Sequence, residues 1–365
     1  MMITANNGFI EQSERYAFDN AGESLKKYIL LQKGELAYNH GASKLRPFGS
    51  CFALTTAESA RIPFVYHCFS AENQNAEFLS IELNGSEVES QLRKIVSSGA
   101  RMDGLLNISF DEYSTVTVLL PDIKEQEHIA DFFRNLDHLI TLHQRKYDKL
   151  QVLKKAMLEK MFPKNGSSVP EIRFKGFTDA WEQRKLGDNI VEYTEVTTEN
   201  NQYPPLTSSR KGIFLQTEYF AGNQIASDDN TGYNIVPYGY FTYRHMSDDE
   251  VFHFNINDIV EKGIVSTLYP VFTTDENLDS RYLQYQLNYG HEFAKFAILQ
   301  KQGGSRTYMY LNKLRQLHLT MPNHVEEQKA ISSFFMNLDH LITLHQRELE
   351  KLQNIKKSML EKMFV

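Results

Sequence analysis

NLDHLITLHQR (residues 135–145) occurs a second time, without a substitution, at residues 337–347. The similarity extends outward on both sides and covers residues 121–162 and 322–364, with one residue inserted in the second copy. Apolar and aromatic residues recur every three to four positions in both copies, which is the spacing of one helical face. Neither copy contains an internal Gly or Pro. The sequence therefore predicts two helices of about 40 residues each.

Each copy opens with a start signal for a helix. A proline is followed by an N-cap residue, Asp122 or Asn323, and Glu125 or Glu326 lies three residues further on, as in a variant of the capping box. Because an average helix has only about 11 residues, helices of this length are expected to pack on each other as an antiparallel coiled coil that acts as a spacer. The alternative is a pair of amphipathic helices packed on separate domains.

Apolar residues are expected to form the contact between the two helices. Such packing of two copies would relate the globular parts by pseudo-twofold symmetry. The residues predicted at this interface are Phe132, Leu136, Leu139, Ile140, Leu150, Phe334, Leu338, Leu341, Ile342 and Leu352.

The sequences ahead of the two helices also resemble each other, but faintly. GELAYN at residues 34–39 aligns with GYFTYR at 239–244, and SSGAR at 97–101 aligns with QGGSR at 302–306. Strand-like alternation, frequent Tyr and Phe, and Gly or Asn punctuation predict short strands and turns with a few helices. The expected fold class is α+β: two pseudo-symmetric mixed α/β domains, separated by the two long antiparallel helices.

One segment has no partner in this repeat. SSVPEIRFKGFTDAWEQRKLGD (167–188) opens the second domain, and nothing matches it ahead of the first, so we expect the first domain to be truncated at its N-terminus. The predicted organisation is a first domain over residues 1–120, a helix over 121–163, a linker over 164–169, a second domain over 170–321 and a helix over 322–365.

The composition favours a two-domain protein of a reducing compartment. A chain of 365 residues exceeds the usual size of one domain. Its 39 basic and 46 acidic residues give a net charge of −7, so binding to nucleic acid would require a local basic patch. Cys51 and Cys68 are expected to be unpaired, buried thiols. Neither a leader nor a long apolar run is apparent, which predicts a cytoplasmic protein with no membrane partner.

Motifs of catalysis are absent from the sequence. It contains no GxxxxGK[ST] phosphate loop, no GxSxG elbow and no HExxH pair. His138 and His143, like His340 and His345, lie five residues apart, which is not the i, i+4 spacing that places two imidazoles on one metal ion. We therefore expect seam or surface histidines, no metal, and a binding protein rather than an enzyme.

Loop-like stretches of both domains supply side chains suited to DNA, where base edges are read by hydrogen bonds and phosphates are fixed by basic residues. Nearby glycines favour Arg101 and Arg306 in particular, because they let the backbone approach a phosphate. The candidates in the first domain are Tyr38, Lys44, Arg46, Ser98 and Arg101. The candidates in the second domain are Ser208, Arg210, Lys211, Arg244, His245, Lys301, Ser305, Arg306 and Tyr308.

Three features together resemble the specificity (S) subunits of type I restriction-modification systems. They are the string FKGFTDAWEQRKLGD, the proline and Glu-Gln pair that enter each long helix, and the tail LKKAMLEKMFP. They occur in the family's order over essentially the whole chain. In that family, two target-recognition domains each read one half of a split DNA sequence, and two long helices separate them.

The resemblance also implies partners and cofactors. The partners are double-stranded DNA, two modification subunits that methylate adenine, and restriction subunits. The chain itself is expected to catalyse nothing and to bind no cofactor, while S-adenosylmethionine, ATP and Mg are bound by the partner subunits. The alternative is a truncated or silent recombination-cassette product that acts only as an interaction protein.

Overall fold

The computed structural model describes residues 1–5, 8–15, 27–96, 106–164, 166–301 and 305–364. The chain divides into two compact units. Unit 1 comprises residues 1–146 and 345–365, and unit 2 comprises residues 147–344. Each unit therefore contains one globular part and a portion of both long helices. None of the helices in the described ranges is long and apolar enough to cross a membrane.

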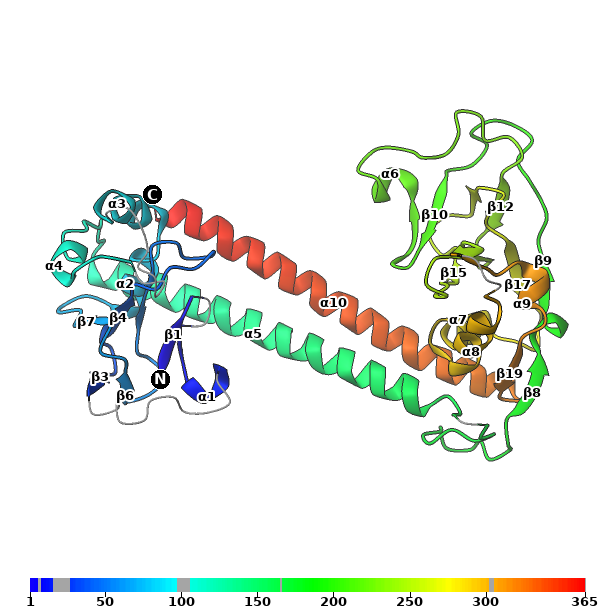
Figure 1. Cartoon of the computed structure of the whole chain (residues 1–365), viewed down its shortest axis with the longest axis horizontal. Helices are drawn as coiled ribbons and strands as arrows, with labels where there is room; N and C mark the ends of the chain where they lie inside the picture. Colours follow the sequence, from blue (N-terminus) through cyan, green and yellow to red (C-terminus); the bar gives the residue numbers. More distant parts are fainter. Residues whose placement is uncertain (6–7, 16–26, 97–105, 165, 302–304, 365) are drawn as a thin grey trace. The chain divides into compact units, whose positions relative to one another are not determined.

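Unit 1 is built around a three-stranded antiparallel sheet in the order β5-β4-β7. Two strand pairs, β1 with β2 and β3 with β6, lie beside it (Figure 1). Cys51 and Cys68 are free thiols, but only Cys51 is buried as predicted, and Cys68 is half-buried. The elements ahead of the first long helix are β1 (Met2–Thr4), β2 (Gly8–Ile10), α1 (Gln12–Arg15), β3 (Ile29–Gln32), β4 (Leu36–Asn39), β5 (Ser50–Ala53), β6 (Ser59–Ile62), β7 (His67–Phe69), α2 (Ala76–Glu82), α3 (Ser86–Ile95) and α4 (Phe110–Tyr113).

Unit 2 is built around a four-stranded antiparallel sheet in the order β15-β13-β17-β9. Its core is aromatic, with Phe241 stacked on Phe272 at a ring-centroid distance of 4.6 Å. Its elements are β8 (Glu182–Lys185), β9 (Ile190–Glu192), β10 (Leu206–Ser209), β11 (Gly212–Leu215), α6 (Gln216–Tyr219), β12 (Asn234–Pro237), β13 (Phe241–Thr242), β14 (Met246–Ser247), β15 (Asn255–Ile256), β16 (Lys262–Val265), β17 (Val271–Thr274), α7 (Ser280–Tyr289), α8 (His291–Leu299), β18 (Thr307–Tyr308), α9 (Leu311–Leu314) and β19 (His318–Met321).

The two units share a topology, although their sequences match only faintly. The order β5-β4-β7 in unit 1 corresponds to β15-β13-β17 in unit 2, and three helices follow in each case. A buried glutamine of each long helix joins that helix to its own sheet domain. Gln126 Oε1 accepts from the backbone N–H of Asn75 at the start of α2, and Gln328 Oε1 accepts from Asp279 at the start of α7, at 3.0 and 2.8 Å.

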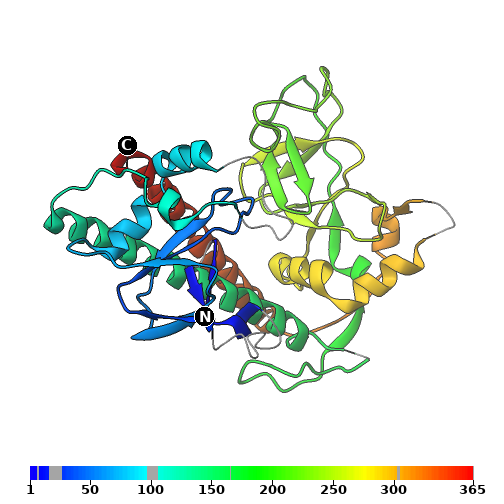
Figure 2. The same cartoon turned by 60° about the vertical axis from the view of Figure 1, so that its left-hand side comes forward.

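The two long helices predicted from the repeat are α5 (Ile123–Lys160) and α10 (Val325–Met363). Within unit 1 they run antiparallel, because Phe133 contacts Phe364 and Lys356 bonds to Asp137. The end of α10 lies beside α2 and α3 in Figure 1 and in Figure 2. There Phe364 also contacts Phe78 of α2. The end of α10 therefore belongs to the core of unit 1.

Contacts of the same kind recur in unit 2 with the two helices exchanged. Lys154 of α5 pairs with Asp339 of α10, and Phe162 stacks on Phe335. Residues of the second copy carry the number of their first-copy equivalents plus 202, as Asn337 does for Asn135. The Lys154 and Phe162 contacts in unit 2 are thus the repeat equivalents of the Lys356 and Phe364 contacts in unit 1.

Burial along the helices corrects part of the predicted interface. Leu136, Leu338 and Ile342 are buried, as expected of contact residues. Leu139 and Leu341 are instead 42% and 43% exposed, because successive helical residues point about 100° apart and the adjacent isoleucine faces inward. The predicted positions that are half-buried are Ile140, Leu150, Phe334 and Leu352.

Phe132 is a second correction of the same kind. It is 40% exposed, while its neighbour Phe133 is 2% exposed and packs in the core of unit 1. Two consecutive aromatic residues cannot both face one helix partner. The sequence pattern selected the wrong member of the pair.

Candidate nucleic-acid interface

Two adjacent structures of unit 2 present the predicted basic residues. The first is the hairpin of β10 and β11, in which Ser209 pairs with Gly212 and the turn consists of Arg210 and Lys211. The second is the pair of β14 and β18, with Met246 opposite Tyr308. Two-residue turns hold their side chains away from the sheet. The hairpin tip therefore displays both cations to solvent.

A run of three acidic residues follows β14 and binds three of the predicted cations. Asp248 accepts from Arg306 Nε at 2.8 Å, and Asp249 accepts from Arg210 Nη1 at 2.8 Å. Glu250 pairs with Lys301. Turn residues therefore bring together basic side chains that lie far apart in the sequence.

These contacts shift the ionisation of the groups involved. Hydrogen bonds from Arg210 and then from Ser247 hold the pKa of the Asp249 carboxyl well below its usual range. The hydrogen bond to Asp248 raises the pKa of the Arg306 guanidinium, and the bond to Asp249 does the same for Arg210. Both arginines are cationic, and both are largely exposed, so water and salt screen the pairs. Phosphate oxygens can compete for such arginines.

Two cations of this group have no acidic partner within the described ranges. Lys211 is exposed at the hairpin tip, and its backbone N–H donates to Ser209 Oγ at 3.1 Å. Arg244 is exposed between β13 and β14. Arg210 and Arg244 line a pocket of about 280 Å³ together with Asp248. The pocket therefore contains one arginine without an acidic partner among the described residues, Arg244, and one that is paired with a carboxylate, Arg210.

Aromatic side chains lie beside this basic group. The His245 ring stacks on Tyr310 at a centroid distance of 5.0 Å, and Tyr308 lies nearly parallel to Tyr310 at 5.9 Å. Tyr308 and Tyr310 are 37% and 48% exposed. Exposed ring faces next to cations are suited to stacking and hydrogen bonding with nucleotides. Tyr310 was not among the sequence-predicted residues.

Burial removes two predicted residues of unit 2 from direct DNA contact. Ser208 is 7% exposed, and its hydroxyl donates to the Thr242 carbonyl at 3.0 Å and accepts from Asn255. His245 is 5% exposed, and its Nδ1 bonds to the Leu268 carbonyl. Both side chains therefore stabilise the packing of the strands and are not available at the surface. Ser305 is exposed.

Fewer of the residues predicted to contact DNA are exposed in unit 1. Tyr38 is 1% exposed, donates from its hydroxyl to the Phe48 carbonyl at 2.6 Å, and stacks on Tyr113 at 3.9 Å, so it belongs to the core. Arg46 is half-buried and donates to the Asn84 carbonyl at 2.6 Å, while burial lowers the pKa of its guanidinium. Lys44 is exposed.

Two further candidates of unit 1, Ser98 and Arg101, lie outside the described residues. The surface of unit 1 that can be assigned from the prediction is therefore limited to Lys44. The structure brings the candidates of unit 2 together, whereas Lys44 is the one fully exposed candidate among those of unit 1 that it describes.

The burial of Tyr38 and His245 follows from a motif that both units share. Tyr38 lies in β4 and His40 directly follows that strand, and Tyr243 and His245 follow β13, with one residue between tyrosine and histidine in each case. Both tyrosine hydroxyls donate to backbone carbonyls, and both histidines bond to carbonyls of other segments. The motif therefore fixes the backbone, and the middle residue, Arg244 in unit 2, faces outward.

The acidic run of residues 248–250 was not among the residues predicted from the sequence. Its signal in the sequence was three consecutive carboxylates, separated from Tyr-Arg-His (243–245) by Met246 and Ser247. A charge run is usually read as a solvated face. Only the fold shows that each carboxylate meets a different cation.

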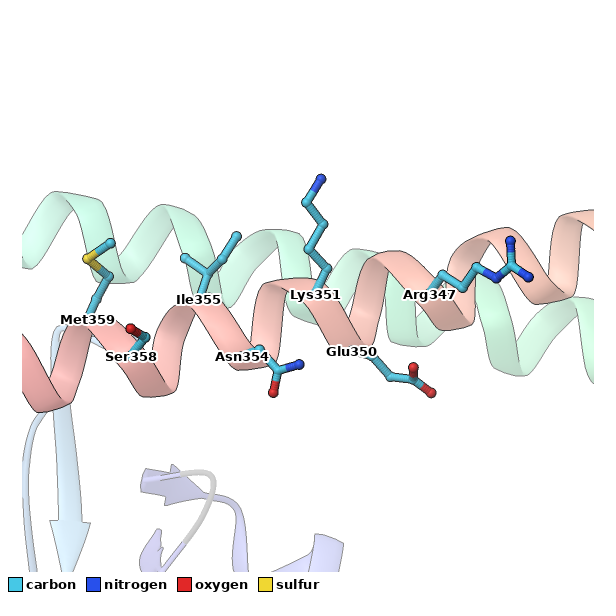
Figure 3. Close-up of a pocket in the computed structure, with 7 residues that line it drawn as sticks. All are labelled: Arg347, Glu350, Lys351, Asn354, Ile355, Ser358 and Met359. Atoms are coloured by element: carbon cyan, nitrogen blue, oxygen red, sulfur yellow. The ribbon is translucent and has the colours of Figure 1, made fainter. Parts of the chain in front are cut away.

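A shallow groove follows the outer surface of α10 within unit 1 (Figure 3). Side chains of both charges and two apolar side chains line it: Arg347, Glu350, Lys351, Asn354, Ile355, Ser358 and Met359. The repeat gives α5 an equivalent series that keeps the charges and the two long apolar side chains but has apolar residues in place of Asn354 and Ser358: Arg145, Asp148, Lys149, Val152, Leu153, Ala156 and Met157. Lys351 and its equivalent Lys149 are both exposed. The same kind of helical surface therefore occurs twice in the chain.

Residues 178–354 match the family model of the type I restriction modification DNA specificity domain. This range covers all of the strands of unit 2, the cluster of cations described above, and most of α10. The matched domain therefore contains the candidate interface.

Comparisons with known proteins extend the match beyond this range. The chain is 23% identical over 316 residues to the specificity subunit of the type I restriction enzyme MjaVIII of Methanocaldococcus jannaschii, covering 78% of this chain and 67% of that protein. It is 24% identical over 274 residues to a second specificity subunit of that organism, named for the enzyme MjaX, covering 70% of this chain and 60% of that protein. The alignments thus span about two thirds or less of these relatives.

A solved structure shows the same fold. The S subunit of the type I restriction-modification system from M. genitalium superposes with a TM-score of 0.52 at 12% identity, over 93% of this chain and 85% of that chain. At this identity the likeness extends to the fold alone.

Proposed function

We propose that this chain is a specificity subunit of a type I restriction-modification system, that it supplies DNA sequence specificity by reading a bipartite site, and that it recruits modification and restriction subunits. The observation that carries this proposal is the position of the basic cluster. It lies inside the residues that match the DNA specificity domain, on a hairpin tip and a strand end where it can reach a groove. The net charge of −7 makes such a local cluster necessary.

Within the cluster, different residues serve different parts of recognition. Arg244 is exposed at the rim of the pocket and has no acidic partner among the described residues, so it is the best placed to contact a base edge. Lys211 at the hairpin tip is suited to a phosphate, which a compact ammonium binds as a point charge. Tyr308 and Tyr310 add ring faces.

Replacement of Arg244 tests the reading role. We expect Arg244→Ala to weaken binding to a cognate duplex by about 1–3 kcal/mol and to relax selectivity in one half-site only. The measurement is adenine methylation of a plasmid library by the complex of this chain with modification subunits. Mapping the methylated adenines gives the sequences of both half-sites at once. Lys295→Ala removes the same charge from an exposed position on α8 and should leave the recognised sequence unchanged.

The outcomes separate two functions. Unaltered recognition in Arg244→Ala would reject the assigned contact. A chain that binds modification subunits but supports no methylation at any sequence would instead indicate an interaction protein without a reading role.

The long helices act as the spacer between two reading units in this proposal. The repeated contacts support it, because Lys356 with Asp137 in unit 1 and Lys154 with Asp339 in unit 2 are equivalent under the repeat. His143 and His345, which are also repeat equivalents, contact each other. A residue that meets its own copy is the signature of a twofold axis. We therefore propose a pseudo-symmetric antiparallel coiled coil.

The groove on α10 and the repeat-equivalent surface of α5 are the proposed docking surfaces for modification subunits. Two chemically similar surfaces suit two copies of one partner. The methyl donor S-adenosylmethionine, and the ATP and Mg of the restriction step, would reside on those partners rather than on this chain. The reading role places the complex in the cytoplasm, with the DNA.

A further inference from the structure

His253 lies on the short segment between the acidic run and β15. Its neighbours Phe252 and Phe254 are buried in the aromatic core of unit 2. The His253 ring is half-buried and faces two pockets instead. Asn288 of α7 holds the segment, because its side chain accepts from the Phe254 N–H at 2.8 Å and donates to the Phe254 carbonyl at 2.9 Å. The position of the imidazole is therefore fixed by the fold.

The two pockets meet at the tip of the hairpin of β10 and β11. One is the pocket of about 280 Å³ that contains Arg244. The other, which we call the hairpin pocket, has a volume of about 400 Å³ and is lined by residues of the hairpin, β15, α7 and α10. Figure 1 shows β15 beside the hairpin, and Asn255 of β15 bonds to the Ser209 carbonyl. Because Arg210 and His253 line both pockets, the hairpin pocket adjoins the candidate interface.

Two ion pairs flank the hairpin pocket on the side of the helices. Arg281 of α7 donates to Asp258 at 2.8 Å, and Asp339 of α10 pairs with Lys154 of α5 at 2.5 Å. Tyr285 also donates from its hydroxyl to Asp339, at 2.7 Å. The charges on this side therefore compensate each other.

The side of the hairpin carries positive charge in excess. Lys211 is exposed and forms no ion pair with a described residue. Arg210 is bound to Asp249, but its side chain is 57% exposed. The imidazole of His253 forms no hydrogen bond within the described ranges. The hairpin pocket thus contains one free ammonium, one accessible guanidinium and one imidazole without a partner.

The neighbouring cations favour the neutral form of this imidazole. Burial first, and then the charges of Arg210 and Lys154, lower the pKa of His253. An anion in the hairpin pocket opposes this effect, because a negative charge near an imidazole favours the protonated form. A protonated imidazole is a donor at both nitrogens. An anion would therefore supply the acceptor that His253 and Lys211 lack in the free chain.

We propose that the hairpin pocket binds a backbone phosphate of DNA through Lys211, Arg210 and His253, and that His253 takes up a proton when the phosphate binds. This proposal rests on the DNA-reading function and adds a phosphate site to it. The shared residue Arg210 supports a DNA phosphate as the ligand, because a strand that meets Arg244 in one pocket has neighbouring phosphates beside the other. His253 then fixes the strand without reading its sequence.

DNA binding should consequently depend on pH. The bound phosphate raises the pKa of His253 relative to the free chain, so affinity rises as pH falls through the bound-state pKa and levels off below the free-state pKa. A phosphodiester keeps its single negative charge over this range, so the change comes from the protein. We expect the His253 contribution to strengthen binding by about three- to tenfold between pH 8 and pH 6, since one unit of pKa shift corresponds to about a factor of ten.

His253→Gln removes this titration and keeps a polar side chain. In complex with modification subunits, the variant should bind DNA at pH 8 as the unaltered chain does, which also shows that it folds. At pH 6 it should bind cognate and random duplexes more weakly by the same factor, about three- to tenfold, because a phosphate contact is independent of sequence. Fluorescence anisotropy of labelled duplexes measures both affinities. Calorimetric titrations in two buffers of different ionisation enthalpy, neither of them phosphate, should show a proton uptake that His253→Gln lacks.

Two further variants separate this site from a general effect of charge. His318→Gln alters an exposed histidine on β19 and should keep the pH dependence of the unaltered chain. Lys211→Ala should lower affinity at both pH values, with a weaker salt dependence, and should reduce the proton uptake.

The outcomes distinguish the phosphate site from the proposed function. Equal pH dependence in His253→Gln and His318→Gln overturns the phosphate site, and so does a change of sequence selectivity in His253→Gln. Proton uptake by His253 on binding of modification subunits, but not of DNA, would assign the pocket to a protein carboxylate and would also overturn it. Failure to bind DNA at either pH would instead reject the proposed function, and the phosphate site with it.

Discussion

Three consecutive acidic side chains, residues 248–250, lie against the cations assigned to DNA. Arg306 and Arg210 are each held by a carboxylate at hydrogen-bonding distance. An arginine held in this way is oriented but partly neutralised, so the carboxylates lower the attraction for any phosphate while leaving the guanidinium edges in place. Such a surface favours a cognate sequence over random DNA, because base contacts must compensate for the weak electrostatic attraction.

Removal of these carboxylates should therefore weaken the discrimination between cognate and random DNA. For Asp248→Asn with Asp249→Asn, we expect affinity for a random duplex to rise by about three- to tenfold at low salt, with a steeper salt dependence, and cognate affinity to change less. Titrations of the random and the cognate duplex at two salt concentrations measure the ratio of the two affinities. Glu199→Gln with Glu276→Gln makes the same charge change at exposed positions that form no ion pair with a described residue. Equal gains in both double variants would show only a general charge effect.

Residue types and loop positions were sufficient to predict exposed cations such as Lys211 and Arg244. They were insufficient for Tyr38 and Ser208, because a side chain at a strand end can face either way. Only the assembled sheet shows that the hydroxyl of Tyr38 satisfies a buried carbonyl. The sequence likewise did not show which cations would meet the acidic run.

At the scale of elements, the long helices were predictable because their periodicity persists without Gly or Pro over each whole copy. The face was harder to assign. Phe132 and Phe133 both fit an apolar spacing, and only packing against Phe364 selects Phe133. The short strands of two to four residues depended on partners distant in sequence, as β14 depends on β18. Their register could not be read from local pattern.

The contact between α5 and α10 includes a pH-sensitive element within unit 1. His345 Nδ1 lies 3.1 Å from His143 Nδ1, and partial burial, then His143 and Lys146, lower the pKa of His345. A group whose pKa is lower when folded contributes stability above its unfolded pKa, near 6.5, and loses it as pH falls. Acidification from pH 7.5 to 5.5 should lower Tm, and His345→Gln should reduce this decrease by a few degrees. His138→Gln, at an exposed position on α5, should leave the pH dependence of Tm unaltered in differential scanning fluorimetry.

At the scale of the whole molecule, the chain presents the same pattern of charged residues on two helical surfaces, and the two surfaces should act independently. Lys351 of α10 and its equivalent Lys149 of α5 are exposed and form no ion pair with a described residue. Reversal of one charge should repel the matching surface of one modification subunit without touching the other, because like charges across an interface oppose binding. If only one of the two surfaces bound a modification subunit, charge reversal at only one of the two lysines would weaken binding.

We therefore expect Lys351→Glu alone and Lys149→Glu alone each to reduce the stoichiometry from two modification subunits per chain to one. The double variant should bind none, and light scattering of the purified complexes distinguishes these masses. Lys357→Glu with Lys155→Glu makes the same double charge reversal at repeat-equivalent exposed positions outside the groove, and it should retain two partners. If Lys351→Glu abolished both copies at once, the two surfaces would be parts of one site, and the reason for keeping the repeat unchanged would have to lie in the packing of the helices instead.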